Sequence, residues 1–418
     1  MRSRLLAGVA LLAILTGGRL AVPALAQNPT NKPAANLDKL DKQQQQEGNA
    51  LVQYVQEAMA GNAVPPDVQM TWRSYFVKSQ NDQVYIPFTV MLEPGKLSGN
   101  QVALYYAVAP KGPRVISVVV KQQEDGETVT VDGEITNSGA KPVENVKLTV
   151  SAMDNNGKTV GTQPATVPSV PAGQRVPFSV SMKRPRNATQ FSANIDGGPQ
   201  GFRDLSFVDL PEPTQGMVRI SRAFAVAAGD YDVFVALRER PGKDQKTAPK
   251  IALLNESITV PDLGGKLTTS SVFIADKIEA LSAPLSREQQ LKQPYTLGTM
   301  AIVPATGTTV AKSGELSVIF FVYNPGIDSS KKPNIEVEYN FHQKTAEGEK
   351  FFNKTNPQQF NAETLPPQFD VAAGHQVVGG QSVPMASFAP GEYRLEVKVS
   401  DKISGQSLTR NVAFTVTG

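Results

Sequence analysis

Alternation of apolar and polar side chains with a period of two is the feature that most limits what this 418-residue chain can fold into. In segment 335–342 the odd positions are Ile, Val, Tyr and Phe, and the even positions are Glu, Glu, Asn and His. Successive side chains of a strand point to opposite faces of a sheet, so this segment predicts a strand with one buried and one solvent-exposed (wet) face. Similar short runs, broken by Gly, Pro, Asn and Asp, fill most of the chain after Val68. Many short strands separated by turn residues predict an all-β protein built of sandwiches.

The first residues have a different composition. Arg2 and Arg4 precede an apolar run over 5–15, and Ala24-Leu25-Ala26 follows. This order of basic, apolar and small residues predicts a secretory signal peptide cleaved near Ala26. The apolar run is shorter than the roughly 20 residues of a membrane span. We therefore expect a periplasmic or secreted protein with no membrane span after cleavage.

Residues 27–66 combine a polar stretch with one amphipathic stretch. The polar part is rich in Asn, Pro, Lys and Gln, has little to bury, and predicts a disordered tether or a solvated helix. Apolar residues then fall at helical spacing: Leu51, Val52, Val55, Ala58 and Met59. They predict a short helix ending near Gly61, which either docks to another molecule or packs on the first sandwich.

Charge and cysteine content exclude several classes of function. The chain has 41 Lys and Arg against 38 Asp and Glu, and the leader holds three of the arginines, so the remainder is balanced at 38 against 38. A balanced charge argues against a nucleic-acid partner. The absence of cysteine excludes disulfides, thiolate nucleophiles, zinc bound by cysteine and a lipid-modified N-terminal cysteine.

Segment 128–195 has the clearest strand order. It contains Gly133-Glu-Ile-Thr-Asn137, then Val146-Lys-Leu-Thr-Val150, then the hairpin signal Asn156-Gly157, and finally Pro171-Ala-Gly173 before Phe178-Ser-Val180. This order resembles the small immunoglobulin-like repeats of the FxLYD type in bacterial extracytoplasmic proteins. The resemblance implies an immunoglobulin-like sandwich over this segment.

A phrase repeated in the second half predicts two domains that end alike. Gly229-Asp-Tyr231-Asp-Val-Phe-Val235 is echoed by Gly391-Glu-Tyr393-Arg-Leu-Glu-Val397. A tyrosine beside a tight turn resembles the tyrosine corner of immunoglobulin sandwiches, in which the hydroxyl bonds to nearby backbone. Tyr231 and Tyr393 are therefore structural candidates. The half that contains Tyr393 also resembles tails of secreted bacterial proteins related to the von Willebrand A group.

The first copy of this phrase comes after segment 128–195, although too few strands follow residue 202 to make a sandwich alone. This favours a first sandwich split by an inserted one, with three sandwiches in series as the alternative. The predicted division is signal peptide 1–26, tether plus short helix 27–66, discontinuous immunoglobulin-like sandwich 67–110 and 200–262, inserted FxLYD-like sandwich 111–199, linker 263–294, and C-terminal sandwich 295–418.

The sequence contains no motif that predicts catalytic, cofactor-binding or metal-binding residues. His342 shares the wet strand face with Glu338, and two such residues fall short of a metal site. His375 lies in a loop without an adjacent nucleophile, and the Asp154 loop lacks the later acids of a calcium loop. No nucleophile elbow, phosphate loop or zinc-protease motif occurs. We therefore expect a protein that is not an enzyme.

Trp72 and Phe76 lie on the same face of a predicted strand. They are candidates for a glycan-binding platform, because aromatic rings stack on sugars, and the other interpretation places them in the core.

These observations predict a non-catalytic, immunoglobulin-like protein that binds a protein or a cell-envelope component as a scaffold, through sheet edges and loops. One alternative is a carbohydrate-binding module. Another is a secreted hydrolase that uses a pair of carboxylates brought together in space. A periplasmic chaperone, with an open sandwich completed by a client strand, is a third.

Overall fold

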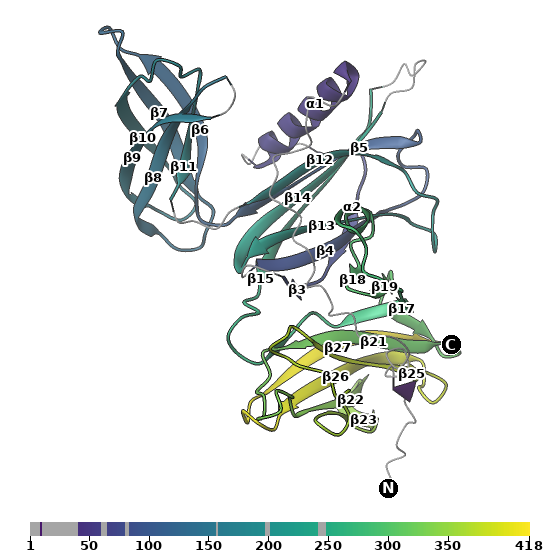
Figure 1. The fold of residues 1–418 in the computed structure, drawn as a ribbon. Coiled ribbons are helices and arrows are strands. Elements are labelled where there is room, and N and C mark those ends of the chain that lie inside the picture. Colours follow the sequence, from purple (N-terminus) through teal and green to yellow (C-terminus); the bar gives the residue numbers. More distant parts are fainter. Residues whose placement is uncertain are drawn as a thin grey trace.

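The computed structural model describes residues 9–10, 41–59, 65–79, 83–155, 158–196, 201–240 and 248–418 (Figure 1). The prediction of an all-β protein is confirmed, because the elements in these residues are strands apart from two helices. The predicted cleavage site, the tether up to residue 40 and the hairpin signal at 156–157 lie outside the described residues. Within the predicted leader only β1 (Val9–Ala10) is described, and it pairs with β25.

In the described part of the chain, neither helix has the length and apolar character needed to cross a membrane.

The first sandwich has two antiparallel sheets, and each joins strands from both sides of a long intervening segment. One sheet has the order β12-β5-β14-β15, from β5 (Gln101–Pro110), β12 (Phe202–Asp209), β14 (Gly229–Glu239) and β15 (Ile251–Val260). The other has the order β13-β4-β2, with β3 also on β4, from β2 (Thr71–Ser74), β3 (Val77–Lys78), β4 (Gln83–Leu92) and β13 (Val218–Ala227). Val108 pairs with Phe202, so the two ends of the intervening segment lie side by side.

The intervening segment forms the middle sandwich, which stands to one side of the first in Figure 1. One sheet has the order β10-β7-β6, from β6 (Pro113–Gln122), β7 (Thr128–Asn137) and β10 (Arg175–Lys183). The other has the order β11-β8-β9, from β8 (Val143–Met153), β9 (Thr159–Val170) and β11 (Gln190–Ile195). Val131, Ile135, Leu148 and Val150 are fully buried in a core that belongs to this sandwich alone.

The C-terminal sandwich has the two largest sheets. One has the order β1-β25-β21-β17-β19-β18, with β16 also on β21, from β16 (Thr268–Thr269), β17 (Phe273–Ala280), β18 (Thr296–Leu297), β19 (Met300–Pro304), β21 (Glu315–Tyr323) and β25 (Val377–Pro384). The other has the order β20-β27-β26-β22-β23, with β24 also on β22, from β20 (Thr309–Ala311), β22 (Ile335–Thr345), β23 (Gly348–Lys354), β24 (Gln358–Phe360), β26 (Gly391–Asp401) and β27 (Ser407–Thr417). Phe341, Phe388, Tyr393 and Phe414 pack together in its core.

The expectation of a linker at 263–294 is wrong. β17 pairs with both β19 and β21, and its Phe273 is fully buried, so the segment is part of the C-terminal sandwich. α2 (Arg287–Lys292) follows Ser286, whose hydroxyl accepts a hydrogen bond from the Gln289 amide as a helix cap. The strand partners of this segment, β19 and β21, come later in the chain, so its own sequence does not show which sheet it joins.

α1 (Lys42–Met59) confirms the predicted helix and extends it into the polar stretch for which we expected a tether or a solvated helix. Asp41 caps this start: its carboxylate accepts from the Gln44 amide at 2.7 Å, and the Gln44 side chain accepts from the Asp41 amide at 3.2 Å. Leu51 and Val55 are fully buried against the outer face of the β5–β14 sheet. Of the two interpretations, packing on the first sandwich is the one observed.

The first and C-terminal sandwiches share an apolar interface rich in tyrosine. The Tyr75 ring stacks on the Phe273 ring, with centroids 4.2 Å apart. The Tyr85 hydroxyl donates to the Pro294 carbonyl at 2.9 Å, and the Tyr323 hydroxyl accepts from the backbone amide of Lys78 at 3.1 Å. Burial raises the pKa of both Tyr85 and Tyr323 well above the usual value. These residues join the two sandwiches through a continuous core.

Candidate functional site

The two glycan-platform candidates pack on the core of the first sandwich. The Trp72 ring lies 6.0 Å from the Phe88 ring, centroid to centroid, and both Trp72 and Phe76 are partly buried. The backbone amide of Phe76 also donates to the Ser271 hydroxyl at 2.8 Å, across the interface with the C-terminal sandwich. Both rings therefore contribute to packing.

Tyr231 and Tyr393 occupy equivalent positions in the first and C-terminal sandwiches. Each ring is fully buried, and each hydroxyl donates at 2.9 Å to the carbonyl four residues earlier, that of Ala227 or Ala389. Burial raises the pKa of Tyr231 to about 12. This hydrogen bond fixes the turn that precedes β14 or β26.

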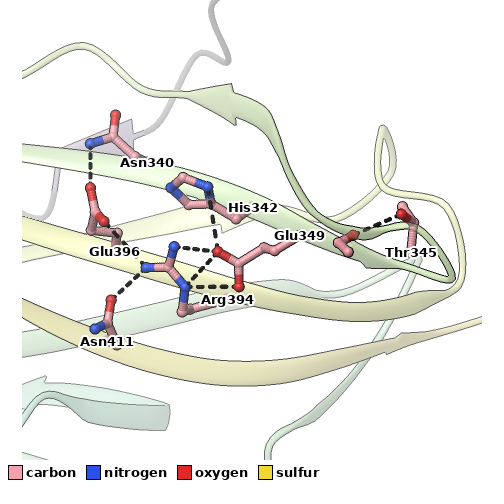
Figure 2. A network of polar contacts seen from close by, with 8 residues as sticks. Asn340, His342, Thr345, Glu349, Arg394, Glu396 and Asn411 are labelled. Carbon is pink, nitrogen blue, oxygen red and sulfur yellow. Dashed lines mark hydrogen bonds and ion pairs between the residues drawn. The ribbon is translucent and has the colours of Figure 1, made fainter.

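His342 belongs to a network of side chains on one face of the β22–β26 sheet (Figure 2). Its Nδ1 lies 3.7 Å from a Glu349 oxygen, and Arg394 binds both oxygens of that carboxylate. These bonds hold the pKa of Glu349 below its ordinary value. Arg394 also contacts Glu396 and Asn411, while Glu338 pairs with Lys398 at 3.0 Å and not with His342.

The same network offers no metal site. Among the described residues, His, Asp and Glu form no group of three that could hold an ion. The nearest carboxylate to His342 is already bound by Arg394, and the imidazole packs edge-on against Phe351.

His375 and Asp154 have local roles in their loops. The imidazole Nδ1 of His375 accepts from the Asp370 amide at 2.9 Å, and its ring lies against Phe369. The Asp154 carboxylate accepts from the Lys158 amide at 3.0 Å across the hairpin. Both side chains use an acceptor atom to order the backbone around them.

Strand β6 is the candidate site, because it is a sheet edge whose segment 117–120 has no proline, charge or bulge to hinder strand pairing. The sheets of the middle sandwich end in four edge strands: β6 and β10, β9 and β11. Two carry prolines inside the strand, at Pro177 in β10 and at Pro164 and Pro168 in β9. The third, β11, has only six residues. Proline and short length both weaken an edge as a template for another strand.

β6 has ten residues, and no proline follows the initial Pro113. A bulge between Val115 and Ser117 precedes a regular ladder with β7 over 117–122. No charged side chain occurs between Arg114 and Lys121. Val119 is 56% exposed and Val120 is 42% exposed, although both are apolar.

The other edge of β6 pairs with no strand of the described residues. Unpaired N–H and C=O groups along a flat edge form a template for an added strand. The sequence patterns did not lead us to expect a site at this strand. The signal was the run Val118-Val119-Val120, since consecutive apolar residues place valine on both faces of an edge strand.

One family model matches part of the middle sandwich. Residues 123–196 match the family model described as "NPCBM-associated, NEW3 domain of alpha-galactosidase". This range contains β7 to β11, and β6 ends one residue before it. The matching family is not the FxLYD type that the sequence resembles. No curated protein matches the chain.

Proposed function

We propose that this chain is a non-catalytic, extracytoplasmic scaffold of immunoglobulin-like sandwiches that binds a partner protein by strand addition to β6. The observation that supports the proposal is the exposed edge of β6, which carries apolar side chains on both faces and has no gatekeeper charge or proline over 117–120. The signal peptide expected from the first residues supports a location outside the cytoplasm.

Strand addition suits this edge for two physical reasons. Backbone hydrogen bonds give affinity to any extended segment, and side chains that alternate between faces give specificity. Val119 and Val120 point to opposite faces, so an added strand would cover apolar surface on both.

We further propose that residues 111–199 form one domain inserted into another, made of 67–110 and 200–262. The pairing of β5 with both β12 and β14 supports this division, because it joins strands from before and after the middle sandwich.

A carbohydrate-binding module is a second candidate function. It is favoured by the match of residues 123–196 to a domain described from alpha-galactosidase. Binding on a glycan array that disappears in the Trp72→Ala variant would support this function and argue against the β6 proposal.

The β6 proposal is tested by Val119→Pro and Val120→Pro, made separately. Neighbouring N–H groups of a strand point to opposite edges, so one variant removes an N–H that faces away from β7 and the other removes a bond to β7. We expect the variant that removes the N–H facing away from β7 to keep the thermal stability of the protein and to lose binding. Val119→Thr, which keeps a β-branched side chain and the N–H, is the matched control.

Binding is measured by recovery of one identified partner from envelope extract, followed by hydrogen exchange of the purified complex. We expect slowed exchange at 117–122 and at least tenfold weaker recovery with the stable proline variant. Protection of another segment, or recovery at the wild-type level with the stable proline variant, would contradict strand addition at β6.

A further inference from the structure

A cleft lies where the first and C-terminal sandwiches meet, and it is separate from β6. Its volume is about 330 Å³. One wall is the outer face of the sheet made by β2, β4 and β13, and the other comes from β17, the end of α2, β18 and β19. Small-molecule pockets occupy roughly 300 to 1,000 Å³, so a ligand of monosaccharide size fits this cleft.

The charges that line the cleft are unbalanced. Arg73, Arg219 and Lys292 line it, against a single acid, Glu279. The Glu279 carboxylate already pairs with Lys277 at 2.5 Å. Among the described side chains no carboxylate makes an ion pair with any of the three cations. The Asp276 carboxylate accepts a hydrogen bond from the Gln215 side-chain amide at 3.2 Å, and Gln215 in turn accepts from Arg219. The cleft therefore favours an anion.

Arg219 has the guanidinium best positioned to bind a ligand, because it is anchored on one side and has a donor left unpaired by the described residues. Its Nη2 donates to the Gln215 side-chain oxygen, which also accepts from the Thr306 hydroxyl at 2.6 Å, so the guanidinium is held in place. Its Nε is buried and has no hydrogen-bond partner among the described residues. Buried donors are normally paired, and the guanidinium fork fits the two oxygens of a carboxylate. Arg73 is likewise anchored, through Nη1 to the Ala305 and Gly307 carbonyls.

A chain of hydroxyls lies in the same cleft. The Thr89 hydroxyl contacts the Ser221 hydroxyl at 2.8 Å and the Tyr295 hydroxyl at 2.9 Å. Three hydroxyls carry three O–H donors, and these two contacts use two of them. At least one donor and several acceptor lone pairs remain for a ligand that bears hydroxyl groups. Met91 and Ile302 add apolar surface to the lining.

We propose that this cleft binds an acidic sugar, a uronic acid residue whose carboxylate bonds to Arg219 and Arg73. Its ring hydroxyls exchange hydrogen bonds with the Ser221–Thr89–Tyr295 chain, and its C–H face contacts Met91 and Ile302. The assignment goes beyond the proposed function and does not rest on it, because the cleft and β6 lie on different sandwiches.

The test is calorimetric titration of the full chain with D-galacturonate and D-glucuronate, and with neutral D-galactose. We expect binding of at least one uronate and at least tenfold weaker binding of galactose. Arg219→Gln, which removes the charge and the fork, should weaken uronate binding at least tenfold. Arg186→Gln is the matched control, because it removes an exposed arginine of the middle sandwich.

Folding of each variant is checked by thermal unfolding, and Arg219→Lys separates charge from geometry. Intermediate binding by Arg219→Lys supports recognition by the fork. The proposal is overturned if neither uronate binds the wild-type chain, if Arg219→Gln binds as the wild type does, or if galactose binds equally well. It is also overturned if inorganic sulfate displaces the uronate at equal concentration, since the site would then recognise charge alone.

Discussion

A single buried ammonium group holds one loop of the C-terminal sandwich. Lys332 is 7% exposed, and its Nζ donates to the carbonyls of Pro366, Pro367 and Phe369 at 2.7, 3.1 and 3.2 Å. An ammonium has three N–H donors, so all of them are used. The side chain therefore fastens the loop before β25 to the turn before β22.

Lys332→Met should destabilise this sandwich, because it leaves three carbonyls without their donor. Hydrogen bonds to charged groups contribute roughly 1.5 to 3 kcal/mol, and we expect a loss of about 2 kcal/mol in the free energy of unfolding, measured with urea. Lys331→Met is the matched control. Its side chain is 63% exposed and pairs with Asp370 at 3.5 Å, so it should change stability by less than about 1 kcal/mol. Equal effects of the two substitutions would contradict the role of Lys332.

Single side chains could be assigned a role from the sequence when their hydrogen-bond partners are near in the chain. Side chains with distant partners could not. Tyr231 and Tyr393 could be proposed because each bonds to a carbonyl four residues away, beside a recognisable turn. Lys332 and Arg219 gave no such signal. The acceptors of Lys332 are backbone carbonyls more than thirty residues later, and the cleft around Arg219 exists only where two sandwiches meet.

Strands buried on one face were easier to predict in detail than strands buried on both. β22 alternates in burial as its sequence does, so its core and wet faces were evident. β5 is buried from Val102 to Ala109, because α1 covers the face that does not enter the sandwich core. β21 is buried on both faces for a similar reason, since the first sandwich covers its outer face. Continuous apolar runs predict such strands but do not say what covers them.

Excision of strands β6 to β11 should leave the first sandwich folded. Val108 pairs with Phe202, so a short turn can join β5 directly to β12 when residues 112–200 are removed. The connections lost are few, among them the hydrogen bond from Arg114 to the Met59 carbonyl. The Lys111–Asp232 ion pair is kept, because both residues remain in the shortened chain.

We expect the shortened chain to keep its near-ultraviolet circular dichroism per aromatic residue, and the separate segment 111–199 to unfold cooperatively. Failure of both fragments to fold would contradict the proposed insertion, and would favour one cooperative unit.

Across the whole molecule, the tyrosine interface predicts sensitivity to alkali. Burial raises the pKa of Tyr85, Tyr295 and Tyr323 above the value of about 10 in an unfolded chain. A raised folded-state pKa means that the stabilisation is complete below the unfolded pKa and is lost as pH rises towards the folded pKa. The free energy of unfolding should therefore be flat just below pH 9 and fall above about pH 10.

The measurement is urea unfolding at several alkaline pH values, together with tyrosinate absorbance. Tyr85→Phe should reduce the slope above pH 10, because one of the three groups no longer titrates. A stability that does not change up to pH 12, or a slope unaffected by Tyr85→Phe, would contradict this account.

The antiparallel pairing of Val108 with Phe202 has a mechanical consequence. A module joined by one peptide can swivel freely about that connection, whereas the middle sandwich is joined by two chain segments that leave the same end of one sheet. Two adjacent attachments restrict its rotation largely to a single hinge axis and divide any pulling force between two covalent backbones. For the strand addition to β6 that we propose, this limited range of orientations would lower the entropy lost on docking.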